Sequence, residues 1–189
     1  PVPLMNVLNG GAHAGNSLDI QEFMLVPVRA DTFRDALRMG AEIHHALGDA
    51  VGHCGVGDEG GYAPDLESHE RALDLLCRAI ESAGYRPGED VYLALDAAAS
   101  EWCSPGVSGY RMPKRGVTLE RGGLLERWQL LTQRYPILSL EDGMGEDDEE
   151  GWLALTAALG SRVQLVGDDL FVTDPARIAR GVERGLANA

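Results

Sequence analysis

Short apolar segments alternate with helix-length segments along this chain, and that alternation limits its fold more than any other feature. The apolar segments predict strands at residues 2–8, 20–28, 91–95, 137–140 and 163–166. Apolar residues at helical spacing predict helices at 32–51, 67–83, 118–135, 149–159 and 174–184. Because strands that bracket helices form β-α units, the pattern indicates an α/β protein with a parallel sheet. Either a barrel or an open, doubly wound sheet satisfies it.

The last three predicted strands each end in a carboxylate: Asp96, Glu141 and Asp168. The carboxyl ends of parallel strands share one face of a sheet or barrel, where active sites form. Three carboxylates there would repel one another without a cation, and oxygen ligands with no histidine or cysteine nearby favour Mg²⁺. The alternative is that acidic residues after strands are helix N-caps, for which Asp142 and Asp169 are the better candidates.

The composition excludes several classes of protein. The 189 residues carry a net charge of −14, which argues against nucleic acid and anionic membranes as partners, since both require a basic face. With 44% hydrophobic residues the chain can build a core, yet no apolar run reaches the ~18–20 residues of a membrane span. Its three cysteines, an odd number without a close-spaced pair, are typical of a reducing cytoplasm.

Two glycine-rich loops hold further candidate residues. The loop at residues 9–16 contains His13, and Gln21 and Glu22 follow it; the loop at 57–64 contains Glu59. Glycines let backbone approach a ligand closely, and a carboxyl framed by them is a reasonable general acid or base. Neither loop has the pattern of a phosphate-binding or dinucleotide-binding loop. Alone, each loop is equally consistent with an ordinary turn.

Several other features are interpreted as structural. The histidines outside the first loop have no ligand-like spacing, the tryptophans suit a core, and the acidic run at 146–150 suits a solvated helix start. These residues are His44, His45, His53, His69, Trp102, Trp128 and Trp152. Lys114, the only lysine, lies in a stretch that reads as surface.

Six segments, in order along nearly the whole chain, closely resemble enolase, the phosphopyruvate hydratase of glycolysis. They are Asn-Gly-Gly-Ala-His-Ala-Gly-Asn at 9–16, Asp-Ile-Gln-Glu-Phe at 19–23, Val-Gly-Asp-Glu-Gly-Gly-Tyr-Ala-Pro at 56–64, Leu-Asp-Ala-Ala-Ala-Ser-Glu at 95–101, Ser-Leu-Glu-Asp at 139–142 and Gln-Leu-Val-Gly-Asp-Asp-Leu-Phe-Val-Thr at 164–173. The resemblance implies a (β/α)₈ barrel of the enolase type, with residues 1–189 forming an incomplete C-terminal barrel domain.

The resemblance also implies a reaction, the Mg²⁺-dependent interconversion of 2-phospho-D-glycerate and phosphoenolpyruvate. It makes Asp96, Glu141 and Asp168 the metal ligands and Glu59 the general acid, with Glu22 as its catalytic neighbour. The small phosphorylated acid would contact a set of residues around them. This implied set is His13, Gln21, Glu22, Glu141 and Asp168.

Two departures from the family pattern lead us to expect an internal fragment. The family's base is a lysine on the strand after the one that ends at Asp168, and Lys114 does not match it. The family's small N-terminal α+β domain is not matched either. A full barrel takes about 250 residues, so we expect truncation before the last strands and an isolated chain without activity. The resemblance implies a cytoplasmic parent, with a surface or secreted pool possible, that forms a homodimer or octamer.

Two alternatives remain open at this point. The chain is a non-catalytic, enolase-like protein with a binding role or none, because proton abstraction needs a positioned base. Otherwise, the same barrel acts on another acid, as in related hydro-lyases or racemases. The Gly-Asp-Glu-Gly-Gly loop at 57–61 argues against this last alternative, because it resembles the loop of true enolases.

Overall fold

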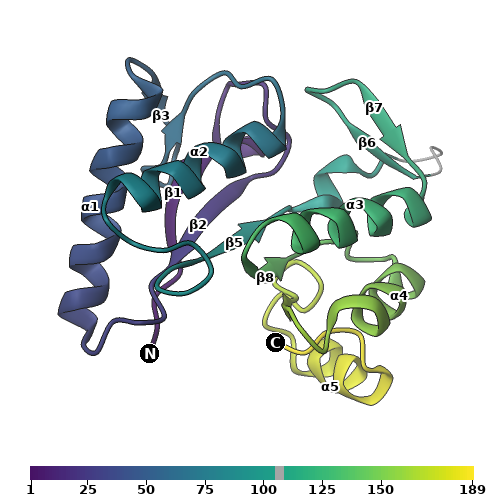
Figure 1. The fold of residues 1–189 in the computed structure, drawn as a ribbon. Helices are drawn as coiled ribbons and strands as arrows, with labels where there is room; N and C mark the ends of the chain where they lie inside the picture. The colour runs from purple at the N-terminus through teal and green to yellow at the C-terminus, as the bar shows by residue number, and fades with distance from the viewer. Residues whose placement is uncertain (105–108) are drawn as a thin grey trace.

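The computed structural model describes residues 1–104 and 109–189 and contains one seven-stranded sheet, in the order β3-β4-β1-β2-β5-β8-β9, and one hairpin, β6-β7. The strands are β1 (Met5–Asn9), β2 (Glu22–Val26), β3 (Gly55–Val56), β4 (Tyr62–Ala63), β5 (Tyr92–Asp96), β6 (Tyr110–Met112), β7 (Val117–Leu119), β8 (Ile137–Glu141) and β9 (Gln164–Val166). Helices follow β2, β4, β7, β8 and β9 along the chain (Figure 1). The α/β fold class predicted from the sequence is confirmed.

The sheet is mixed, which corrects the prediction of a parallel sheet. Strands β5, β8 and β9 are parallel to one another, as the β-α alternation predicts. Strand β2 is antiparallel to both β1 and β5. The connection between β1 and β2 is a loop that contains one turn of 3₁₀ helix, η1 (Gly11–His13), and such a short link joins antiparallel strands. The α-helices begin only after β2, and a connection that includes such a helix is long enough to join parallel strands.

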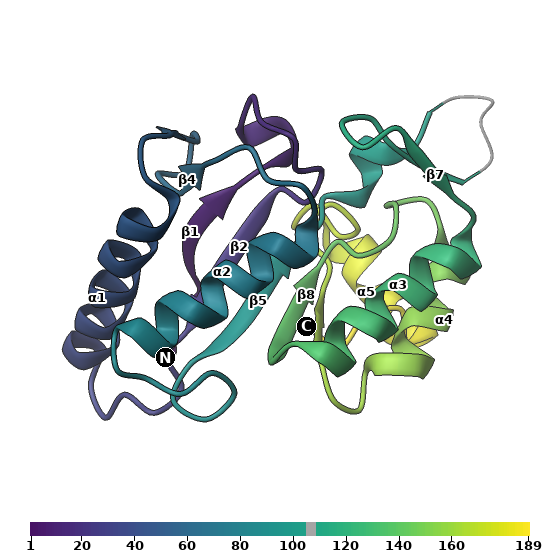
Figure 2. The same cartoon turned by 45° about the horizontal axis from the view of Figure 1, so that its top comes forward.

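Five helices follow the predicted positions closely: α1 (Phe33–Val51), α2 (His69–Ser82), α3 (Arg121–Arg134), α4 (Glu149–Leu159) and α5 (Pro175–Arg184). Four of them, α1, α2, α4 and α5, begin where a side chain accepts a free backbone N–H group. The Thr32 hydroxyl accepts from the Asp35 N–H, and the Asp174 carboxylate accepts from two N–H groups at the start of α5. Figure 2 shows α1 and α2 beside β1, β2 and β5, with α3 beside β8 and α4 beside α3.

The core lies between the sheet and the helices. Alternate residues of the strands, such as Phe23 on β2 and Leu95 on β5, join the buried faces of the helices in one large cluster. The other face of the sheet carries only a small cluster around Met24 and Ala94. The three tryptophans predicted to be structural are almost completely buried, so that interpretation is confirmed.

Over the described residues the sheet is not closed, because β3 and β9 form its two edges. The fold is therefore a partial barrel of α/β type. The two short hairpins, β3-β4 and β6-β7, were not among the predicted elements, since strands of two or three residues give no periodic signal. Within the part of the chain that the structure describes, no helix combines the length and apolarity that a membrane crossing requires.

Candidate active site and metal centre

Three acidic side chains form a row where three neighbouring strands of the sheet begin or end. Glu22 on β2 is the register partner of Asp96 on β5, and Asp96 is the register partner of Glu141 on β8. Directly opposed residues in a ladder point to the same face. Alternation along β2 and β5 places this face with Met24 and Ala94, away from the helices. The fold therefore gathers side chains that are far apart in sequence at one edge of the sheet face that the helices leave open.

The predicted metal ligands fall into two overlapping groups. In the first, oxygens of Asp96, Glu141 and Asp142 all lie within 4.8 Å of one another. In the second, oxygens of Asp142, Asp168 and Asp169 satisfy the same limit. Asp96 and Glu141 are thus neighbours, while the exposed Asp168 joins them through Asp142. Every donor is a carboxylate oxygen, which is the ligand type that hard divalent cations take.

Asp142 is the residue that the sequence interpretation underestimated. We expected it to cap a helix; instead its Oδ2 accepts the Asp169 N–H at 2.9 Å and holds the turn after β9. The residue is only 3% exposed, and it adopts a left-handed backbone conformation with φ 43°. Its Oδ1 is buried without a hydrogen-bond partner in the structure. The only sequence signal that Asp142 belongs to the carboxylate group was its position directly after Glu141.

The crowding of these carboxylates shows in their pKa values. Burial, and then the charges of Asp96, Asp142 and Asp168, raise the pKa of Glu141 to about 8. Burial is also the main reason that the pKa of Asp142 rises to about 7. The pKa of Asp96 is raised by burial, against the N–H of Ala98 and the amide of Gln21, which stabilise its charge. A bound cation would relieve this repulsion, so the unpaired Asp142 oxygen and the raised pKa values fit a metal ion at this centre.

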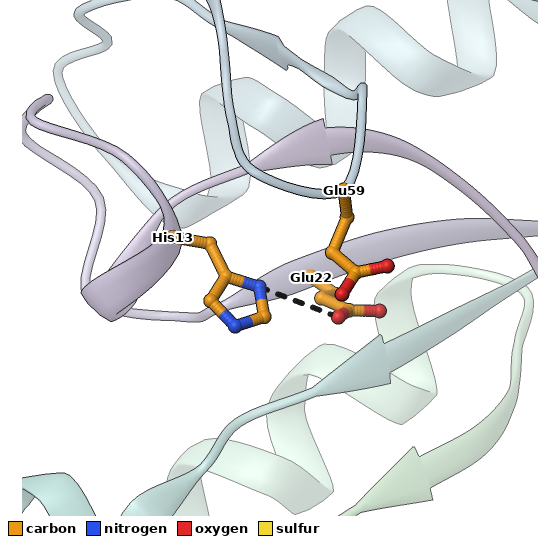
Figure 3. Close-up of side chains that lie close together, drawn as sticks. All are labelled: His13, Glu22 and Glu59. Carbon is orange, nitrogen blue, oxygen red and sulfur yellow. Dashed lines mark ion pairs between the residues drawn. The ribbon is translucent and has the colours of Figure 1, made fainter.

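A second group lies beside the first and consists of His13, Glu22 and Glu59 (Figure 3). The His13 Nδ1 is 3.5 Å from a Glu22 carboxylate oxygen, and both side chains are largely shielded from solvent. Glu59 is exposed and extends toward Glu22 from its loop. Burial raises the pKa of Glu22, and the charges of Asp96 and Glu59 add to that effect. The group thus combines a shielded carboxyl, an accessible carboxyl and an imidazole.

Hydrogen bonds between the two glycine-rich loops bring this group together. The Asp58 N–H donates to the His13 carbonyl at 3.2 Å, and the Asn9 side chain accepts the Gly61 N–H at 3.0 Å. Gly57 has no room for a side chain, because an added Cβ would lie 2.6 Å from atoms of Asn9. The Gly57 backbone therefore packs against the Asn9 side chain, and the two loops lie close enough to bring His13 and Glu59 together with Glu22.

Gln21 connects the two groups. Its Nε2 donates to Asp96 Oδ2 at 3.2 Å, and its backbone N–H donates to the Asp96 carbonyl at 3.0 Å. The side chain therefore contacts a candidate metal ligand and lies next to Glu22 in the chain. The resemblance implies that Gln21 lies beside the substrate, and that role stays a prediction.

The comparison with known families agrees with this geometry. A family model described as the C-terminal TIM barrel domain of enolase matches residues 1–189, which is the whole chain. The chain belongs to the enolase family. The enolase resemblance and the partial TIM-barrel fold predicted from the sequence are thereby confirmed, and the family is one of lyases. The roles of individual residues in this enolase-family chain, and the identity of its metal, remain predictions.

Proposed function

We propose that this chain supplies the metal-binding and proton-donating groups of an enolase site, which interconverts 2-phospho-D-glycerate with phosphoenolpyruvate and water. The observation that carries the proposal is the adjacency of two carboxylate groups at one sheet face. Glu22 is the register partner of Asp96, so the group of His13, Glu22 and Glu59 lies directly beside the candidate metal centre. The family match supports the same reaction class.

In this proposal Asp96, Glu141 and Asp168 would hold Mg²⁺, and Asp142 holds the turn that carries Asp168. A bound ion would supply positive charge to stabilise the negative charge that develops on the substrate carboxylate when the neighbouring C2 proton is removed. Carboxylates that repel one another in the free protein are suited to this role, because the cation offsets their mutual repulsion.

The acid step falls to Glu59 in the proposed site. As the C2 proton leaves, its electron pair forms the C2–C3 double bond and the C3–oxygen bond breaks. The departing hydroxyl takes a proton from the Glu59 carboxyl and leaves as water. Glu22 lies between Glu59 and Asp96, and the raised pKa of Glu22 favours keeping a proton within this group. His13 orients Glu22 from the opposite side.

The proton-abstracting base is assigned by the resemblance to a lysine on a further strand. The only lysine of this chain, Lys114, donates its ammonium to the Ala14 carbonyl, which does not fit that role. We therefore propose that the 189 residues by themselves bind ligand without turning it over. The same resemblance supports a glycolytic, cytoplasmic enzyme that assembles as a homo-oligomer.

Isothermal titration calorimetry with the chain tests this proposal. We expect 2-phospho-D-glycerate to bind in the presence of Mg²⁺ and to bind at least tenfold more weakly without it. Unphosphorylated D-glycerate serves as the control ligand, since tight binding of that acid would favour another hydro-lyase or a racemase. Binding that is insensitive to Mg²⁺, or no binding at all, would favour the non-catalytic alternative. Formation of phosphoenolpyruvate by the chain alone would contradict the assignment of the base.

A further inference from the structure

The single lysine of the chain is bound to the loop that carries His13. Lys114 lies in the turn between β6 and β7, and its Nζ donates to the Ala14 carbonyl at 2.6 Å. The side chain is half-buried, and burial lowers its pKa, against the charges of Asp19 and Asp65. This corrects the interpretation of the stretch around Lys114 as surface. The contact joins residues that are 100 positions apart.

The buried carboxylate of Asp19 fixes the same turn from the other side. It accepts the Lys114 N–H at 2.8 Å and the Arg115 N–H at 3.2 Å, and the residue is only 1% exposed. Asp19 belongs to the segment that follows the His13 loop. The turn between β6 and β7 is therefore held at two points. The Ala14 carbonyl accepts from the Lys114 side chain, and the Asp19 carboxylate accepts from the backbone of Lys114 and Arg115.

His69, the first residue of α2, anchors Asp19 in turn. Its Nε2 accepts the backbone N–H groups of Asp19 at 3.0 Å and Ile20 at 3.4 Å. The ring is completely buried, and burial, followed by the charges of Arg127 and Arg115, lowers its pKa to about 3. A neutral imidazole acceptor at this point keeps the Asp19 backbone in place without adding charge.

These contacts form a continuous path to the candidate site. Ala14 directly follows His13, whose own carbonyl accepts the Asp58 N–H of the loop that carries Glu59. A shift of the Ala14 carbonyl would therefore move His13 relative to Glu22, and it would act on Glu59 as well. Among the described residues, Lys114 is the one charged side chain that donates a hydrogen bond to the backbone of the His13 loop.

We propose that Lys114 is a positioning residue for the candidate site: its ammonium holds the Ala14 carbonyl so that His13 faces Glu22 and Glu59. Lys114 is expected to order the loop at residues 10–19, and this effect is inferred from geometry alone. Its expected effect on the binding of a phosphorylated acid rests on the proposed function. Lys114 is then required for ligand binding, although it does not touch the ligand.

The test compares Lys114→Met with Arg111→Met by hydrogen–deuterium exchange and by calorimetry. Methionine keeps the backbone N–H that Asp19 binds and removes only the ammonium, while Arg111 is exposed on the same hairpin. We expect exchange of the 10–19 amides to rise about tenfold in Lys114→Met alone. We also expect binding of 2-phospho-D-glycerate to weaken about tenfold, with Mg²⁺ binding unchanged within about twofold. Lys114→Arg, which keeps a cationic donor, should largely retain the slow exchange of the loop and the binding of 2-phospho-D-glycerate.

Each outcome decides the question. Unchanged loop exchange in Lys114→Met would overturn the proposal. A rise in exchange spread evenly over the whole chain would also overturn it, because that pattern would mean that Lys114 stabilises the whole fold and not this loop. If Lys114→Met does not fold, Lys114→Gln provides the same comparison. If the unmodified chain binds no 2-phospho-D-glycerate, the proposed function fails, while the exchange measurement still decides whether Lys114 orders the loop.

Discussion

Asp96 and Glu141 lie opposite each other at the ends of two parallel strands, and this pairing is the main structural fact of the candidate site. Both side chains point to the face that the helices leave open, and Asp142 completes their group. The burial of Glu141, followed by the charges of Asp96, Asp142, Asp168 and Glu22, raises its pKa to about 8. We therefore expect metal binding near neutral pH to displace a proton from this group.

Metal binding should consequently depend on pH. Since ligands must be deprotonated, we expect the affinity for Mg²⁺ to rise as pH increases from about 6 to about 8, with proton release on binding. Calorimetry in buffers of different ionisation enthalpy measures that release. In Glu141→Gln, which cannot ionise, the proton release should fall and Mg²⁺ affinity should drop at least tenfold. A pH-independent affinity would contradict the pairing of these carboxylates around a metal.

The same shift has a consequence for the stability of the metal-free chain. A carboxyl whose folded pKa exceeds its unfolded value binds more protons in the folded state, so stability falls as pH rises through that interval. For Glu141 the interval runs from its ordinary value of 4.5 to about 8. Glu141→Gln should therefore stabilise the metal-free chain at pH 8 by about 1–3 kcal/mol, measured by urea unfolding. An equal or lower stability at that pH would count against the shift.

Asp142 is expected to combine a structural contact with an effect on the metal. Asp142→Asn keeps an oxygen for the Asp169 N–H and removes the charge, so folding should persist while Mg²⁺ affinity falls about tenfold. Asp142→Ala removes the acceptor and leaves a gap, which should cost about 2 kcal/mol of folding free energy. Denaturant unfolding and Mg²⁺ titration of both variants separate the two effects. Unchanged Mg²⁺ binding in Asp142→Asn would restrict the residue to its role in the turn.

His69 should make the chain sensitive to acid. Its folded pKa of about 3 lies below its ordinary value of 6.5, so the unfolded state binds a proton first. The contribution of His69 to stability should accordingly be fully present above pH 6.5 and be lost as pH decreases toward 3. In His69→Gln we expect a loss of about 2 kcal/mol at pH 7 and a weaker dependence on acid, as measured by urea unfolding from pH 4 to 7. His53→Gln, the same substitution at an exposed histidine, provides the control.

Glu59 and its neighbour Asp58 allow a test of the proposed acid. Both carboxylates are exposed in the same loop, but Glu59 belongs to the group with His13 and Glu22. Wherever turnover of 2-phospho-D-glycerate is measured for an enzyme that contains this sequence, Glu59→Gln should lower it by at least about a hundredfold. Mg²⁺ affinity should stay within about twofold, and Asp58→Asn should leave turnover nearly intact. Normal turnover in Glu59→Gln would exclude it as the acid.

Much of the candidate site could be predicted because its residues end strands or lie in glycine-rich loops. Asp96, Glu141 and Asp168 follow short apolar runs, and the enolase resemblance named His13, Glu22 and Glu59 before their positions were known. The structure places the two groups side by side. It also divides the three expected metal ligands between groups that share Asp142, a distinction that no local pattern contains.

The sequence by itself determined the elements whose signals are local, namely the helix periods and the strand ends. Those signals depend on apolar spacing within a few residues. Only the tertiary structure decided that β2 runs antiparallel to β5, because strand direction depends on how the sheet packs as a whole. It also decided that Lys114 reaches Ala14, since burying a lysine ammonium at a carbonyl 100 residues away requires the entire core to bring the two loops together.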